Sequence, residues 1–143
     1  MRDEEIGLLV FLGLGVIMMI IRFRWREKFE GFGRVPPPDP AYASQFAVLR
    51  DEDYDLVLRG AATVNHLKAS GPVFRLLVSR GQAELRVSGA EPVRIVRAEV
   101  TGLEWVGPFG RGFRFHTASG RLDKVTVWPQ GTAGEQLAEL GWR

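Results

Sequence analysis

Cysteine is absent from the chain, and histidine occurs only twice, at His66 and His116. Without cysteine there is no disulfide, no thiol nucleophile and no cysteine-bearing zinc site. Neither histidine has a serine and an acid at a spacing that indicates a catalytic triad, and strand alternation places His116 on an outward face. The sequence therefore predicts no catalytic, metal or cofactor-binding residue, and we expect a protein that is not an enzyme.

A strong excess of either charge is also missing. Between residues 36 and 143, 13 Lys and Arg residues stand against 12 Asp and Glu residues. Nucleic-acid-binding domains normally carry a concentrated positive field, which this segment does not supply. We therefore expect no nucleic-acid partner.

Long hydrophobic segments are missing except for one, residues 6–21, with the sequence IGLLVFLGLGVIMMII. At about 1.5 Å per residue this run spans roughly 24 Å, and a basic and aromatic flank extends it toward the roughly 30 Å core of a bilayer. The run predicts a transmembrane helix of about eighteen residues. The expected membrane-interface residues are Arg22, Phe23, Arg24, Trp25 and Arg26.

The flanks of this run indicate a retained anchor and its orientation. A cleaved signal peptide needs a basic N-terminus and small residues before the cleavage site, but residues 1–5 are net acidic and the residues after the run are bulky and basic. Only Arg2 precedes the run, whereas five Lys and Arg residues follow it between residues 22 and 34. Because cytoplasmic flanks carry the Lys and Arg excess, we expect the N-terminus outside and the C-terminal portion in the cytoplasm. The alternative is a helix buried against other subunits.

Proline punctuates the chain after the anchor. Three consecutive prolines, Pro36 to Pro38, and a fourth at Pro40 exclude a continuing helix. Residues 29–45 are therefore predicted to form a proline-rich, semi-rigid linker that holds the following domain away from the bilayer. The chain is thus divided into an anchor with its basic flank (1–28), the linker (29–45) and one domain (46–143).

An acidic cluster, DEDYD at residues 51–55, has alternating aspartates of the kind found in calcium-binding loops. Such a loop needs glycine at its sixth position and glutamate at its twelfth, but Leu56 and Ala62 stand there. We therefore expect a solvated turn or the start of a helix, without a metal ion.

Short apolar–polar alternations separated by turn residues follow from about residue 63 and predict antiparallel strands. Alternate residues are expected to face inward, among them Leu85, Trp105 and Phe113, whereas Glu84 and His116 face outward. The expected strands are residues 73–79, 83–87, 92–97, 101–106, 112–117 and 122–128, with one or two fainter ones between residues 56 and 68.

The end of the chain changes to a helical pattern. Thr132 and Glu135 have the spacing of a capping box, Ala133 begins an apolar stripe at i, i+4 and i+7, and Gly141 can stop the helix. The sequence therefore predicts an α+β fold. A single N-terminal transmembrane helix is followed by a mainly antiparallel β-barrel or sandwich that a C-terminal α-helix caps.

The order of these elements resembles the pleckstrin-homology-like (PH-like) superfold, and in particular small PH-like domains attached to single transmembrane helices in bacteria. The likeness covers roughly residues 61–143. It rests on the segments 67–76 (LKASGPVFRL), 93–104 (VRIVRAEVTGLE), 112–115 (GFRF), 125–129 (VTVWP) and 137–142 (LAELGW). The resemblance implies a PH-like domain in a single-pass protein of the bacterial cell membrane.

Four residues are tentative contact residues. Arg75 and Arg80 lie around the first hairpin, where phosphoinositide-binding PH domains carry a basic pattern, but the spacing here is too wide to reproduce it. Phe109 beside Arg111, in a glycine-rich turn, points to a membrane or protein contact. The expected function is a non-enzymatic, membrane-anchored binding or scaffolding module with a protein partner. The alternatives are an accessory subunit of a larger membrane complex and a reader of anionic lipid head groups.

Overall fold

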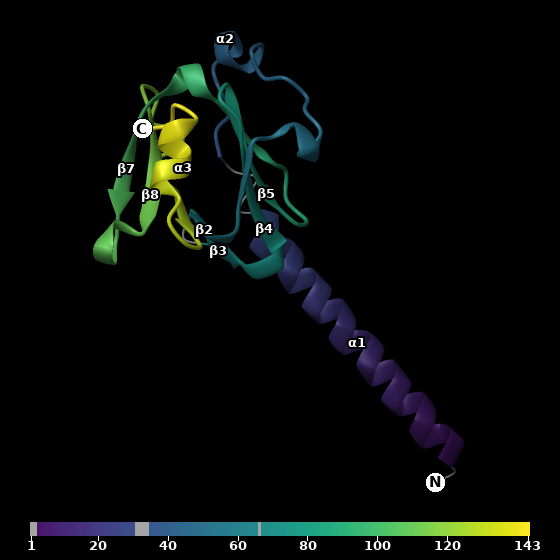
Figure 1. Ribbon diagram of the computed structural model, residues 1–143. Coiled ribbons are helices and arrows are strands. Elements are labelled where there is room, and N and C mark those ends of the chain that lie inside the picture. Colours follow the sequence, from purple (N-terminus) through teal and green to yellow (C-terminus); the bar gives the residue numbers. More distant parts are fainter. Residues whose placement is uncertain (1–2, 31–34, 66) are drawn as a thin grey trace.

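The computed structural model describes residues 3–30, 35–65 and 67–143, with backbone alone over residues 23–30. Figure 1 shows a long helix, α1, extending away from two β-sheets that pack face to face. The helices are α1 (Asp3–Glu30), α2 (Pro40–Ala43) and α3 (Gly134–Glu139), and short 3-10 turns are η2 (Asp51–Asp53), η3 (Gly71–Val73), η4 (Arg97–Glu99) and η5 (Pro108–Gly110). The strands are β1 (Leu56–Leu58), β2 (Gly60–Val64), β3 (Leu67–Ser70), β4 (Phe74–Val78), β5 (Gln82–Val87), β6 (Val93–Val96), β7 (Val100–Val106), β8 (Gly112–Thr117) and β9 (Val125–Pro129).

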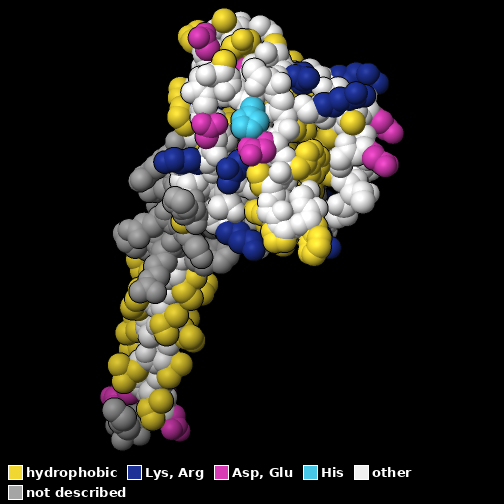
Figure 2. Space-filling view, turned by 90° about the vertical axis from the view of Figure 1, so that its left-hand side faces the viewer, with side chains coloured by type: hydrophobic (Ala, Val, Ile, Leu, Met, Phe, Trp, Pro, Cys, Tyr) yellow, Lys and Arg dark blue, Asp and Glu magenta, His cyan; other side chains and the backbone are white. Residues whose placement is uncertain are grey.

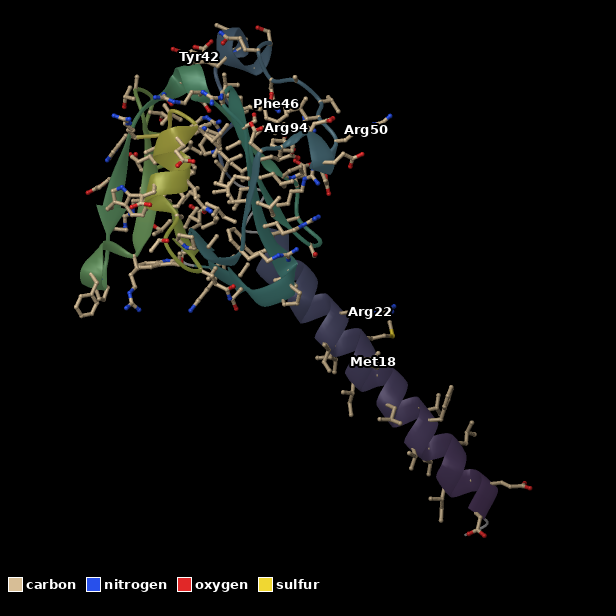
Figure 3. The ribbon with its side chains drawn as sticks, in the orientation of Figure 1. Met18, Arg22, Tyr42, Phe46, Arg50 and Arg94 are labelled. Carbon is tan, nitrogen blue, oxygen red and sulfur yellow. The ribbon has the colours of Figure 1, made fainter. Side chains whose placement is uncertain are left out.

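Helix α1 contains a stretch, Asp3–Arg22, that is long and apolar enough to cross a membrane. The helix continues past the roughly eighteen residues expected from the apolar run, because no glycine or proline occurs between residues 16 and 30 to end it. Arg22 is exposed one turn beyond Met18, as Figure 3 shows. The other expected interface side chains lie outside the described residues: Phe23, Arg24, Trp25 and Arg26.

The two sheets are antiparallel throughout. One has the strand order β1-β4-β5-β6 and the other β3-β2-β9-β8-β7. The chain passes between sheets at three corners: Arg59–Gly60, η3 and η4. Gly60 makes the first corner with a φ of 143°, and a Cβ there would lie 2.1 Å from the Trp128 carbonyl oxygen, so only glycine fits. The predicted α+β class, with an apolar N-terminal helix, antiparallel sheets and a short C-terminal helix, is confirmed.

The hydrophobic core lies between the sheets, and α3 closes it. The expected inward residues of β4 and β8 are buried, with Phe74, Phe113 and Phe115 at most 1% exposed. Leu137 of α3 and the following Trp142 are equally buried. The Trp142 ring meets Phe115 edge-on at 5.7 Å, and its indole N–H donates to the Ser79 carbonyl at 2.7 Å. The C-terminal segment is therefore fastened to both sheets.

The outward face of β5 is covered, which corrects the prediction that Glu84 faces solvent. The segment before β1 folds over this face, and Tyr54 donates its hydroxyl hydrogen to Glu84 at 2.9 Å. Gln82 bonds both backbone groups of Ala47 and donates to the Tyr54 hydroxyl. Arg94 lies 5.4 Å over the ring of Phe46, and Figure 3 shows these two side chains together. Alternation predicts the side of a strand on which a residue lies, but not whether a distant segment covers that side.

The C-terminal helix and the last strand begin later than expected. Ala133, not Thr132, is the N-cap of α3, no side chain caps it, and the predicted capping box is absent. Residues 122–124 form a turn before β9 begins at Val125, since Leu122 accepts a turn hydrogen bond from the Val125 N–H. Gly141 does adopt the predicted left-handed conformation, with a φ of 85°.

The start of the proline-rich segment is bound to the domain at Arg121. The Arg121 guanidinium donates to the Pro36 carbonyl at 3.0 Å, to the Arg94 carbonyl at 2.6 Å and to Glu99 through Nε at 3.1 Å. Arg121 and Glu99 form an ion pair in which the side chains are only 5% and 4% exposed. Val35 also packs against the core. The linker is therefore attached to the edge of β6 at its first proline, and does not act as a free spacer from end to end.

Candidate functional site

The predicted pair Arg75 and Arg80 does not form one site. Arg75 lies in β4 and is 3.4 Å from the carboxylate of Asp51, which also pairs with Arg86. Arg80 is exposed in the β4–β5 turn, five residues further on, or roughly 17 Å along an extended chain. The hydrogen bond from Arg86 lowers the pKa of Asp51. The Asp51 carboxylate therefore faces the guanidinium groups of both Arg75 and Arg86.

The tip of the β7–β8 hairpin presents the predicted pair Phe109 and Arg111. Phe109 is 92% exposed and has a φ of 61°, a left-handed conformation that a bulky residue rarely adopts. The Arg111 guanidinium lies 5.5 Å over the Phe109 ring. The fold thus places an unburied aromatic ring under a cation at the end of a hairpin.

The Trp128 ring supports this tip from the outer face of the sheet, a contact that the sequence patterns did not indicate. A Cβ at Gly112 would lie 2.7 Å from the Trp128 ring, and one at Gly107 would lie 2.5 Å from it. Both glycines therefore leave room for the indole, which covers the backbone where the hairpin begins and ends. To predict that an aromatic ring packs on a glycine of the neighbouring strand, one must know the strand register, and the local alternation of residues does not give it.

Replacing Gly112 by alanine is expected to lower the free energy of unfolding by about 1–3 kcal/mol, because the added methyl group must displace the Trp128 ring. Urea denaturation followed by tryptophan fluorescence measures both the stability and the environment of the ring. Gly81→Ala is the matched control, since a Cβ at Gly81 meets nothing within 4 Å. Equal stability of the two variants would show that the ring does not rest on Gly112.

A groove lies between the hairpin tip and the segment that leads into α3. Its lining includes Trp105, Phe109, Arg111, Pro129 and Glu135. Trp105 was expected inside but is 43% exposed, because β7 is the edge strand of its sheet; its ring still packs on Phe113 at 5.3 Å. Figure 2 views the face of β7 and β8, where hydrophobic side chains gather at the lower edge of the domain.

The outer face of β7 and β8 is polar and ion-paired. His116 lies 2.9 Å from Glu104, both half exposed, and Arg114 donates to the Thr126 hydroxyl at 3.0 Å. The other histidine, His66, lies outside the described residues. Within residues 3–30, 35–65 and 67–143, no cluster of His, Asp and Glu has a geometry suited to a metal ion. The groove at the hairpin tip is consequently the strongest candidate for a contact site.

Comparisons of the chain with protein-family models, with curated proteins and with solved structures found no match in any of the three. The function is therefore inferred from the helix, the fold and the groove alone.

Proposed function

We propose that this protein is a single-pass protein of the bacterial cell membrane whose PH-like domain is a non-enzymatic binding or scaffolding module at the cytoplasmic membrane surface. Helix α1 is the anchor, with the N-terminus outside, as the Lys and Arg excess after the span favours. The same length and composition also suit a signal sequence, but the acidic N-terminus argues against that alternative.

Phe109 is the observation that carries the proposal of a binding role. A fully solvated phenylalanine gains nothing from burial, and its left-handed backbone conformation adds a cost of order 1–3 kcal/mol. Such a cost is typical of residues that serve a contact. Trp105 lies in the same groove, and aromatic residues with arginine are the side chains most often found at the centre of protein interfaces.

A lipid head-group reader is the weaker alternative, because Arg75, one of the two tentative contact arginines, faces the Asp51 carboxylate at 3.4 Å. An accessory subunit of a larger membrane complex has one observation in its favour. Gly7, Gly13 and Gly15 are small residues within α1 that permit another helix to approach closely, although no two of them have the four-residue spacing of a Gly-x-x-x-Gly motif.

Purification of the tagged full chain in mild detergent, after crosslinking in cells, tests the proposal. We expect a soluble protein partner whose recovery falls at least about fivefold in Phe109→Ser. The matched control is Val48→Ser, because Val48 is also 92% exposed but lies far along the chain from the groove. Partners that are all integral membrane proteins and insensitive to Phe109→Ser would indicate the accessory subunit instead.

Protease protection tests the orientation. On intact spheroplasts we expect the folded domain to resist added protease, and on inverted vesicles to be digested. Digestion from outside the cell would overturn the cytoplasmic placement, and a shortened mature chain would indicate a cleaved signal sequence.

A further inference from the structure

The outer edge of β7 carries backbone groups without partners. In an antiparallel pair, successive residues point their N–H and C=O groups alternately to the neighbouring strand and away from it. Leu103 donates its N–H away from β8, to the carbonyl of Arg143 at 3.0 Å. Trp105, two residues on, therefore points its N–H and C=O outward too, and neither has a backbone partner within the described residues.

The last residue already uses one of the outward groups of this edge. The main-chain oxygen of Arg143 accepts from the Leu103 N–H, and a Cβ at Gly102 would meet the same oxygen at 3.6 Å. Its contact covers the edge near the middle of β7 and leaves the part at Trp105 open. The open part adjoins the groove, because Trp105 also lines the groove.

The side chains around the open edge define what could bind there. Trp105 and Phe109 offer apolar surface, and Arg111 forms no ion pair in the part of the chain that the structure describes. Glu135 lies on the α3 side of the groove, so an incoming carboxylate is favoured only on the hairpin side. A peptide that pairs with Trp105 needs an apolar side chain for the groove and an acidic one for Arg111.

We propose that β7 binds an extended segment of a partner protein, which adds as a short strand at Trp105, inserts an apolar side chain between Trp105 and Phe109, and pairs an Asp or Glu with Arg111. The inference rests on the proposed binding function and specifies its partner. Main-chain hydrogen bonds supply part of the affinity, and the two side-chain contacts supply the selectivity.

The groove and the point where the linker is attached lie at different ends of β8. Val35 and Pro36 adjoin Lys124 and Val125, at the start of β9. The pairing of Phe113 with Val127 places this start beside the end of β8, whereas the hairpin tip precedes Gly112 at the opposite end. The six residues of β8 span roughly 17–20 Å. The start of the linker, at Val35 and Pro36, and the groove are therefore at opposite ends of the sheet.

Selection of phage-displayed random dodecapeptides on the full chain in nanodiscs tests the proposal. We expect enriched peptides to carry an aromatic or aliphatic residue one to three positions from an Asp or Glu. Affinity for a representative synthetic peptide should fall at least about tenfold in Phe109→Ser and remain unchanged in Val48→Ser. Arg111→Glu should reverse the selected charge, so that Lys or Arg replaces the acidic residue.

Two substitutions at Trp105 separate the backbone contact from the ring contact. Trp105→Ala retains the outward N–H, whereas Trp105→Pro removes it at an edge position where proline is tolerated. We expect Trp105→Pro to bind more weakly than Trp105→Ala at equal thermal stability. Equal affinity would overturn strand addition. Enrichment of peptides that lack an acidic residue and bind Arg111→Glu equally well would overturn the pairing with Arg111. Capture of the nanodiscs by anionic vesicles that Phe109→Ser abolishes would assign the groove to lipid.

The two proposals can fail separately. If no peptide is selected but the crosslinked partner is still lost in Phe109→Ser, the proposed binding function is retained and binding of an extended peptide is rejected.

Discussion

Arg121→Met is expected to lower the free energy of unfolding by about 3–5 kcal/mol. Arg121 and Glu99 are both at least 95% buried, and removal of the guanidinium leaves the Glu99 carboxylate in the interior without its counter-charge. The same change leaves the carbonyls of Arg94 and Pro36 without their donor. Urea denaturation of the full chain in nanodiscs, followed by tryptophan fluorescence, measures the loss.

A double substitution distinguishes the lost charge pair from lost packing. Arg121→Met with Glu99→Leu removes both charges, and we expect it to recover much of the stability, because an apolar pair of similar volume costs little or nothing in such a position. The control is Arg80→Met, an exposed turn residue where a change within about 0.5 kcal/mol is expected. A loss below 1 kcal/mol in Arg121→Met would show that water or another group reaches Glu99.

Leu12→Arg combined with Val16→Arg is expected to remove the protein from the membrane fraction. Near the centre of a span each arginine costs about 2.5–3.5 kcal/mol, whereas a Leu, Ile, Phe or Val contributes only about −0.3 to −0.6 kcal/mol. Two arginines therefore offset roughly ten or more apolar residues, which is nearly the whole run over residues 6–21. Alkaline extraction of membranes separates integral protein in the pellet from released protein.

The matched control for this change is Leu12→Ala with Val16→Ala, at the same two exposed positions of α1. Alanine is nearly neutral in a span, so this variant should stay in the alkaline-resistant pellet. Retention of the double arginine variant in that pellet would contradict a role of α1 as a bilayer anchor, and would favour a helix surrounded by other protein.

Local patterns were sufficient to predict the elements whose residues meet their neighbours in sequence. The alternation of β4 and β8 identified Phe74, Phe113 and Phe115 as core residues, and the apolar run identified α1. Contacts between distant segments were not predictable in this way. Arg121 meets Glu99, 22 residues away, and Pro36, 85 residues away, and no spacing in the sequence indicates such a pairing.

In the candidate site, too, the residues in local turns could be predicted, and the contacts between distant segments could not. Phe109 and Arg111 could be predicted from a glycine-rich turn that follows an alternating segment, because such turns lie at hairpin tips. Arg75 was named as a tentative contact residue, and its ion pair with Asp51 could not be predicted, since the cover over β5 brings the acidic cluster to it. The open edge at Trp105 depends on which residues of β7 point their backbone N–H and C=O groups away from β8. Only the register between the two strands determines this.

The attachment of Pro36 to Arg121 limits where the domain can search for a partner. Helix α1 extends to Glu30 and the bound segment begins at Val35, and five peptide links reach at most about 18 Å. If α1 spans the bilayer, the groove samples a thin layer above the membrane and not the whole cytoplasm. A partner that is itself held at the membrane then meets the groove at a local concentration set by that layer, which can reach the millimolar range that short linkers give. A weak contact of a few residues would be well occupied under those conditions, although the same peptide free in solution would bind poorly.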